Sequence, residues 1–350
     1  MEIQKLLLWI VINVSTLTMI SSQSLLQVDQ DLGSFTNQDR NYTMGFEFGW
    51  ESSRVNDFFK KRRSIIGVLG SALAFQSIQL DPDMKGYYSI GVVAFTPDSL
   101  NSTLVQYGDR PYSSLFYNRF SLLAFDESAK LGIDTYVWVG MLGLHVAEYF
   151  QTAIHTGNRA WNNKDTPYDP LGWNNQISNH GELTFDFAFN LRRLVKDSKY
   201  LSLRWDYGFN LGLYQRSINS NGIVVIGESA ISVMNQSGGV IASNTSADVD
   251  YEKGHYMYLI ANYNPYYVFK NQSISGGFRE SIHTEEERKV VHNFRVGLNY
   301  DYVRRNEGSK KAKKFHQFKL LYNWKTNEFV AGIDNKRNHQ WWTFFYQSSF

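Results

Sequence analysis

Long stretches of this chain alternate strictly between apolar and polar side chains. The apolar positions of two such stretches are Leu183, Phe185, Phe187, Phe189 and Leu191, followed by Leu201, Leu203, Trp205, Tyr207, Phe209, Leu211 and Leu213. Residues 42–50 and 293–301 repeat the pattern. A period of two residues is that of a β-strand, because successive side chains point to opposite faces. The sequence therefore predicts strands with one apolar, aromatic-rich face and one face of charged residues and glycines.

The length of these strands narrows the choice of architecture. The alternation extends over seven to thirteen residues, beyond the roughly five or six that are usual in soluble sheets. A soluble β-sandwich or a lipocalin-like barrel would turn the charged face outward. A transmembrane barrel turns the apolar face to lipid and the polar face inward. Only a closed barrel pairs every backbone group of a sheet within lipid.

The C-terminus favours the transmembrane barrel. Trp342, Phe344, Tyr346 and Phe350 lie at alternate positions among the last residues. A last amphipathic strand that ends in an aromatic residue is typical of bacterial outer-membrane barrels, and Phe350 is the expected signal for the barrel assembly machinery. We therefore expect an antiparallel transmembrane β-barrel in the bacterial outer membrane, with a soluble periplasmic β-sandwich as an alternative.

Residues 1–22 have the composition of an export signal. Lys5 precedes an apolar run that Asn13 interrupts, and two serines close the run at position 22. A charged start, an apolar centre and small residues at the exit form a secretory signal peptide. A single N-terminal anchor is the alternative. The barrel domain is then expected to comprise residues 23–350.

Composition excludes several other classes of protein. After the N-terminus, no stretch reaches the roughly 18–20 consecutive apolar residues of a membrane-spanning helix. Aromatic residues make up 16% of the chain, far more than disordered chains contain. The formal charge of +2 argues against a nucleic-acid partner. The chain has no cysteine, which excludes thiol catalysis, disulfides and thiolate metal sites and, in an exported chain, fits a bacterial envelope.

The alternation and its interruptions predict about twelve strands. The expected ranges are 24–32, 41–51, 86–96, 111–125, 130–143, 178–195, 198–214, 221–233, 255–269, 288–304, 314–324 and 340–350. An even number agrees with bacterial barrels. Residues 53–85 and 233–254 have no clear phase. Within the first of them, residues 54–75 are expected to form a short periplasmic helix followed by a disordered or looped piece.

Unusual polar residues gather in three of the predicted connections. With both termini in the periplasm, the connections after the first, third and fifth strands face the cell exterior. They contain Asp29–Asp31 with Asp39–Thr43, then Gly108–Tyr112, then Glu148–His155 with Gly172–Gln176. Three separate blocks that meet at one rim indicate a functional site.

Residues 144–157 break the β pattern and are expected to form a short helix after the fifth strand, because their apolar side chains recur at helical spacing. Gln151 and His155 lie four residues apart and share one face of that helix. His155 is a candidate general base, since the ordinary pKa of imidazole is near neutrality. A solvated surface histidine is the alternative.

Carboxylates at the first connection are candidate ligands for a hard cation. Asp29 and Asp31, together with Thr43 and backbone carbonyl groups, offer the oxygen ligands that Ca²⁺ takes. Ordinary loop polarity is the alternative. No HExxH or GxSxG arrangement provides a competing catalytic pattern.

Taken together, four elements on this strand pattern resemble those of the outer-membrane lipid A deacylase family (LpxR-like). The family's elements have the forms DRxxYT-G, GDRPY, QxxxH in the helix after strand 5, and GWxxQ. The matching positions are Asp39–Gly45, Gly108–Tyr112, Gln151 with His155, and Gly172 with Trp173 and Gln176. The resemblance covers most of the mature chain and implies a barrel of twelve strands.

The resemblance also implies an activity. Members of the family hydrolyse the 3′-acyloxyacyl ester of lipid A with the help of Ca²⁺, at the rim in the outer leaflet, so lipopolysaccharide is the implied substrate. The implied catalytic residues are His155, which deprotonates water, and Gln151 and Thr43, which orient the base, the ester or the metal. The implied metal ligands are Asp31, Gln30 and Asp29. The implied substrate-binding residues are Arg110, Asp109, Trp173 and Gln176.

This chain departs from the family's pattern near the end of the first strand and after the third. The pair at the end of the first strand is Asn-Asp in the family and Gln30-Asp31 here, and a glutamine is one methylene longer. A lysine that relatives carry after the third strand is absent, with Ser102 at the nearest place and Arg110 as a candidate substitute. These changes motivate an alternative function, a non-catalytic barrel that is either an inactive relative or a narrow pore.

The predicted inward faces argue against an open pore. They carry a set of charged residues that are expected to pair with one another and fill the lumen. These are Glu47, Asp186, Arg192, Arg204, Asp206, Arg295 and Asp301.

Overall fold

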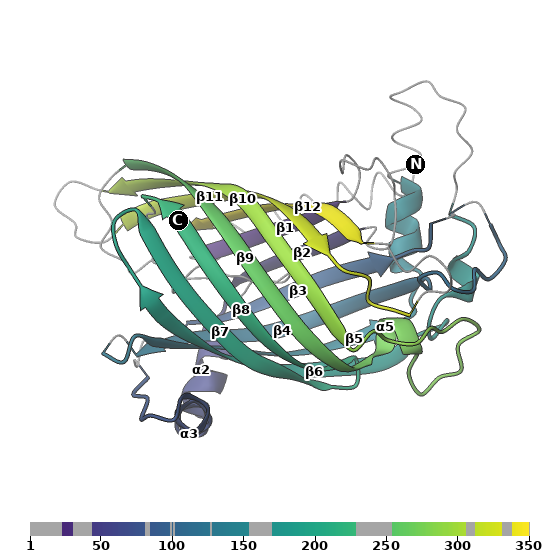
Figure 1. Cartoon of the computed structure of the whole chain (residues 1–350), viewed down its shortest axis with the longest axis horizontal. Helices are drawn as coiled ribbons and strands as arrows, with labels where there is room; N and C mark the ends of the chain where they lie inside the picture. Colours follow the sequence, from purple (N-terminus) through teal and green to yellow (C-terminus); the bar gives the residue numbers. More distant parts are fainter. Residues whose placement is uncertain are drawn as a thin grey trace.

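Twelve antiparallel strands close into a barrel, in which β1 pairs with both β2 and β12 (Figure 1). The structure is a computed structural model that describes residues 23–30, 44–80, 85–98, 100, 102–126, 128–153, 170–228, 254–305, 312–330 and 338–349. The strands are β1 (Gln23–Gln30), β2 (Met44–Glu51), β3 (Lys85–Phe95), β4 (Ser113–Asp126), β5 (Leu131–Leu142), β6 (Glu182–Lys196), β7 (Leu201–Gly212), β8 (Gln215–Gly227), β9 (Gly254–Asn271), β10 (Val290–Arg305), β11 (Ala312–Lys325) and β12 (His339–Ser349). The predicted fold class is confirmed, and the alternative of a soluble sandwich is wrong.

The start of β8 lies well before the predicted one. The strand begins at Gln215 rather than near residue 221. Residues 215–221 read QRSINSN, with polar side chains on both faces, so the hydrophobic pattern gives no signal there. These residues are held in the sheet by backbone pairing with β7 and β9. Residues 1–22 and Phe350 lie outside the described residues.

The apolar faces of the strands point out of the barrel. Leu183 and Phe185 on β6 are 63% and 43% exposed, while Asp186 between β6's apolar residues is 3% exposed. On β7, Trp205 is likewise exposed, and Arg204 is buried. This is the arrangement that a transmembrane barrel requires.

Charged side chains pair inside the lumen, as the sequence predicts. Arg204 Nε lies 2.7 Å from Asp206 Oδ1, and Arg192 forms an ion pair with Asp134. All four come from the adjacent strands β5–β7. Buried charges are tolerated when they are paired and hydrogen-bonded, and these two pairs satisfy charges that face the lumen between β5 and β7.

Two helices occupy the connection between β2 and β3, where the sequence predicted one helix and a looped piece. They are α2 (Ser53–Lys60) and α3 (Arg63–Ala74). Ser52 caps α2, since its Oγ accepts a hydrogen bond from Val55 N at 3.5 Å. The apolar run of α3 suits a strand or a helix equally, and packing of Ile66, Gly70 and Ala74 along one face decides for the helix. The prediction of a looped second half was therefore wrong.

The opposite end of the barrel carries the connections that follow the odd-numbered strands. The described parts are residues 96–98, 100, 102–112, 143–153, 170–181, 272–289, 326–330 and 338. They include η1 (Trp173–Asn175) and α5 (Gln272–Ser275). Residues 146–153 are helical, which confirms the described part of the predicted helix after β5, and they are called the rim helix below. Among the described residues, none of the helices is both long enough and apolar enough to cross a membrane.

Candidate functional site

The rim helix lies against the outside of the barrel wall. Ala147 is fully buried and packs in one cluster with Met44, Val92 and Ala94, which come from the outward faces of β2 and β3. Val146 and Phe150 border the same cluster, so the apolar spacing that predicted the helix is also what docks it. The rim helix is thereby held at the lipid-facing surface rather than over the lumen.

A buried amide on this helix is fixed by a tryptophan. The side chain of Gln151 is 1% exposed, and its Oε1 accepts a hydrogen bond from Trp173 Nε1 at 3.0 Å. The Trp173 ring packs on Tyr112, with 5.0 Å between ring centroids. Gly172 is required beside them, because a Cβ there would lie 2.4 Å from the Tyr112 ring. The Gln151 Nε2 donor is buried and has no hydrogen-bond partner among the described residues.

Gln176 and Glu148 take part in hydrogen bonds that connect the rim helix to the loop beside the Gln151 amide. Gln176 Nε2 donates to Asn179 Oδ1 at 3.3 Å, and the same oxygen lies 3.0 Å from His145 Nε2. His145 Nδ1 in turn bonds the carboxylate of Glu148. These contacts tie the start of the rim helix to the turn after η1. His155 and Thr43, the other two predicted catalytic residues, lie outside the described residues.

The predicted metal ligands divide between the two faces of β1. Asp29 is 2% exposed and points into the lumen, where its carboxylate accepts a hydrogen bond from Gln27 Nε2 at 3.1 Å. Gln30 follows it and so points outward; it pairs in register with Met44, which contacts the rim helix cluster. Asp31 lies outside the described residues. In the described part of the chain, no three His, Asp or Glu side chains are grouped to hold a metal ion.

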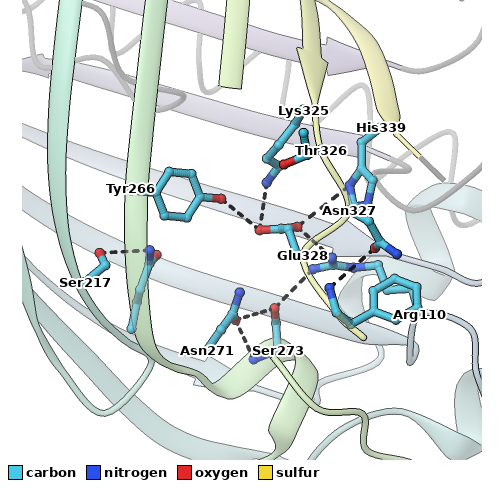
Figure 2. Close-up of polar contacts among 12 residues, drawn as sticks. Arg110, Ser217, Tyr266, Asn271, Ser273, Lys325, Thr326, Asn327, Glu328 and His339 are labelled. Carbon is cyan, nitrogen blue, oxygen red and sulfur yellow. Dashed lines mark hydrogen bonds and ion pairs between the residues drawn. The ribbon is translucent and has the colours of Figure 1, made fainter. Parts of the chain in front are cut away.

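Arg110 belongs to the mouth of the lumen and not to the outer wall. Its buried guanidinium contacts Glu328 through Nη1 at 2.6 Å and donates to Ser273 Oγ at 3.2 Å (Figure 2). It also lies 3.8 Å above the ring of Phe95. Phe95 packs with inward-facing residues, so the barrel wall separates Arg110 from Gln151. Asp109 stabilises the turn that positions Arg110. Its carboxylate accepts hydrogen bonds from the backbone N–H groups of Asp98 and Arg110.

Glu328 is the centre of a buried charge cluster that the sequence did not reveal. We call Arg110, Lys325, Glu328 and His339 the mouth cluster. Lys325 Nζ lies 2.9 Å from Glu328 Oε1, which also accepts a hydrogen bond from Tyr266 OH at 3.2 Å (Figure 2). Burial alone would raise the pKa of Glu328, but Lys325 and Arg110 outweigh it and hold that pKa well below its ordinary value.

Replacing Trp173 with phenylalanine is expected to loosen the rim helix. The variant removes the donor to Gln151 Oε1 and leaves a buried oxygen unpaired, at a cost of about 1–3 kcal/mol. Amide hydrogen exchange followed by mass spectrometry should then show faster exchange in the peptide that contains residues 146–153. Trp205→Phe, on the lipid-facing wall of β7, is the control. Equal exchange of that peptide in both variants would contradict a positioning role for Trp173.

Comparison with known proteins supplies a family. A family model described as "Outer membrane protein LpxR" matches residues 6–344. LpxR from Salmonella typhimurium has a similar structure, with a TM-score of 0.67 and 13% identity, covering 94% of this chain and 100% of that one. The β domain of the Bordetella autotransporter BrkA gives a TM-score of 0.39 at 10% identity, covering 94% and 97%. A sequence search of curated proteins finds no match.

Proposed function

The chain belongs to the LpxR family of outer-membrane proteins, and from that premise we propose that it is a lipid A 3′-O-deacylase. The observation that carries the proposal is the rim helix docked on the outer wall, where the buried amide of Gln151 is held by Trp173 on the same face as Ala147. Lipid that surrounds the barrel reaches such a site without leaving its leaflet. We place this end of the barrel at the cell exterior, because connections after odd-numbered strands face outward when both termini are in the periplasm.

His155 is the proposed general base. On a helix it shares the face of Gln151, four residues earlier. His155 accepts a proton from a water molecule whose oxygen adds to the ester carbonyl carbon, and then returns the proton to the departing alkoxide. The ester bond breaks to give a carboxylic acid and a free hydroxyl on the sugar. Gln151 Nε2, which has no hydrogen-bond partner within the described part of the chain, is a suitable donor to the oxyanion or to His155.

Trp173 is then a positioning residue, because it acts on substrate only through Gln151. Thr43 remains a proposed orienting group. We assign Arg110 to the mouth cluster instead of to the substrate, since it contacts Glu328 and Ser273. It therefore does not replace the lysine that relatives carry.

A cation at this site would be held by Gln30 and Asp31. The amide oxygen of Gln30 on the outer face and the carboxylate of Asp31 are oxygen ligands of the kind that Ca²⁺ takes. Asp29 does not fit such a set, because its carboxylate is buried on the lumen side. When bound, the ion would supply positive charge to the developing oxyanion or to a lipid A phosphate.

Mass spectrometry of lipid A tests the function directly. Cells that express the protein are expected to contain lipid A lighter by one acyloxyacyl group than cells without it. Unchanged lipid A in cells whose barrel is folded in the outer membrane would contradict the proposal. It would favour the alternative of an inactive relative, for which the Gln30-Asp31 pair is the motivation.

Removal of divalent cations is expected to stop deacylation. With EGTA present, purified protein should release no more fatty acid from lipopolysaccharide than a blank, and excess Ca²⁺ should restore the release. The reason is that Gln151 is a neutral donor, so the positive charge for the oxyanion must come from the cation. Full activity in EGTA would exclude Ca²⁺ from the reaction.

A further inference from the structure

Helices α2 and α3 pack on the outside of the barrel, at the end opposite the rim helix. The cluster that holds them contains Val55, Phe59, Ile66, Ala74, Ile78 and Leu80 on the helical side and Leu122, Ala124, Leu131, Ile133, Phe189 and Leu191 on the strands. The strand residues are outward-facing positions of β4–β6. Tyr207 of β7 also donates a hydrogen bond to Leu73 O at 3.1 Å. The helices therefore cover lipid-facing wall.

The face of α3 turned away from the wall is apolar as well. Ile65 and Val68 on α3 are each 71% exposed, and Phe75 at its end is 96% exposed. On the outer wall beside the helices, Phe120 of β4 and Val139 of β5 are exposed as well. The exposed side chains of α3 continue that surface outward from the barrel.

Basic residues follow the same surface. Residues 53–74 contain five basic side chains and one acidic one, and four of the basic ones form the run 60–63 between the helices. Lys60, Lys61 and Arg62 are exposed. The Arg62 guanidinium lies 3.8 Å above the Phe58 ring and donates to Phe58 O at 2.9 Å, so its charge is held beside an exposed aromatic ring.

The level of these helices corresponds to a membrane interface. In Figure 1, α3 is seen nearly end-on while the barrel extends horizontally, so the helix runs across the barrel axis. At the same end of the barrel, β9–β12 carry outward-facing histidine and tyrosine pairs. His255 Nδ1 lies 2.7 Å from Tyr300 OH, and His316 Nδ1 lies 2.9 Å from Tyr346 OH. Belts of amphipathic aromatic residues mark the headgroup level of a bilayer.

We propose that α2 and α3 form an in-plane anchor that binds anionic phospholipid headgroups in the leaflet opposite the rim helix. The apolar face of α3 enters the acyl-chain boundary, and the run 60–63 meets the phosphates. A lipid surface is the occupant that satisfies both features, because the helices stand on lipid-facing wall and present apolar and basic groups side by side. A periplasmic protein at this face is the competing occupant.

Spin labels test the depth of α3, and the natural absence of cysteine makes single-cysteine variants straightforward. The full mature barrel is reconstituted into vesicles of phosphatidylethanolamine and phosphatidylglycerol with a label at Ile65→Cys or Val68→Cys. Both labels are expected to collide with oxygen rather than with a water-soluble nickel complex, as a label at Val296→Cys on the wall of β10 does. Lys199→Cys, in the exposed turn between β6 and β7 at the same end, is the aqueous control.

Labels on α3 that behave like the label at Lys199 would overturn the anchor and favour a protein partner.

Binding of headgroups is tested separately with the double variant Lys60→Gln, Lys61→Gln. We expect phosphatidylglycerol retained per barrel in native mass spectrometry to fall about twofold or more. Lys196→Gln, Lys199→Gln removes the same charge at the same end and is expected to retain the wild-type amount. Equal retention in the two double variants would overturn specific headgroup binding.

Discussion

Replacing His155 with alanine is expected to lower the rate of lipid A deacylation by about 10²- to 10⁴-fold, the usual contribution of a positioned general base. The variant loses the group that accepts the proton of the attacking water, while the barrel wall and the docking of Ala147 and Gln151 are untouched. The measurement is the release of fatty acid from lipopolysaccharide by purified protein, together with lipid A mass spectrometry from expressing cells.

His145 provides the matched control for this variant. It lies at the start of the rim helix and bonds Glu148 and Asn179, so His145→Ala removes a histidine from the same segment without touching the proposed base. It is expected to keep activity within a few-fold of wild type. Normal deacylation by His155→Ala would remove His155 from the mechanism, and equal losses in both variants would indicate a structural role.

Glu328→Gln is expected to lower the free energy of unfolding by about 3–5 kcal/mol, the usual cost of breaking a buried ion pair. The glutamine keeps the size of the side chain but leaves Arg110 and Lys325 buried without their counter-charge. Denaturant titration of the barrel in micelles at pH 7 measures the loss. Glu286→Gln changes an exposed carboxylate in a neighbouring connection and should cost less than about 0.5 kcal/mol.

The difference between wild type and Glu328→Gln should also depend on pH. The pKa of Glu328 is lowered in the folded barrel, so its stabilising contribution is complete above the pKa of the unfolded chain, near 4.3. It is lost as the pH falls from there toward the folded pKa. The gap between the two proteins should therefore be widest at neutral pH and narrow below about pH 4. A gap independent of pH would show that the charge of Glu328 is not the cause.

Strands were predictable where one face is apolar and the other polar. Residues 183–191 and 201–213 each show the period without a break, and the structure has β6 and β7 there. Residues 215–221 carry polar side chains on both faces, so the hydrophobic pattern gave no signal there, although the backbone pairs with β7 and, in part, with β9. In α3 the opposite problem arises, because a short apolar run has no period that separates a helix from a strand.

The site was predictable only as far as local spacing reaches. Helical spacing placed Gln151 on a docked helix, but its contact with Trp173 depends on the path of a long connection. Asp29 and Gln30 are neighbours on β1 and therefore face opposite sides of the barrel wall. The prediction that both bind one cation conflicts with this alternation. The pair of Arg110 and Glu328 spans 218 positions and follows from closure of the barrel, which no local pattern encodes.

The position of the rim helix on the outer wall decides how an inhibitor would find this protein. On the proposed function, a compound dissolved in the medium does not meet the outer wall directly, whereas one dissolved in the bilayer meets the rim helix from the side. The fraction of sites occupied by a competitor should therefore depend on its concentration in the membrane and not on its concentration in bulk water. A homologous series with lengthening alkyl tails should gain potency in step with its oil–water distribution, even if the polar head never changes.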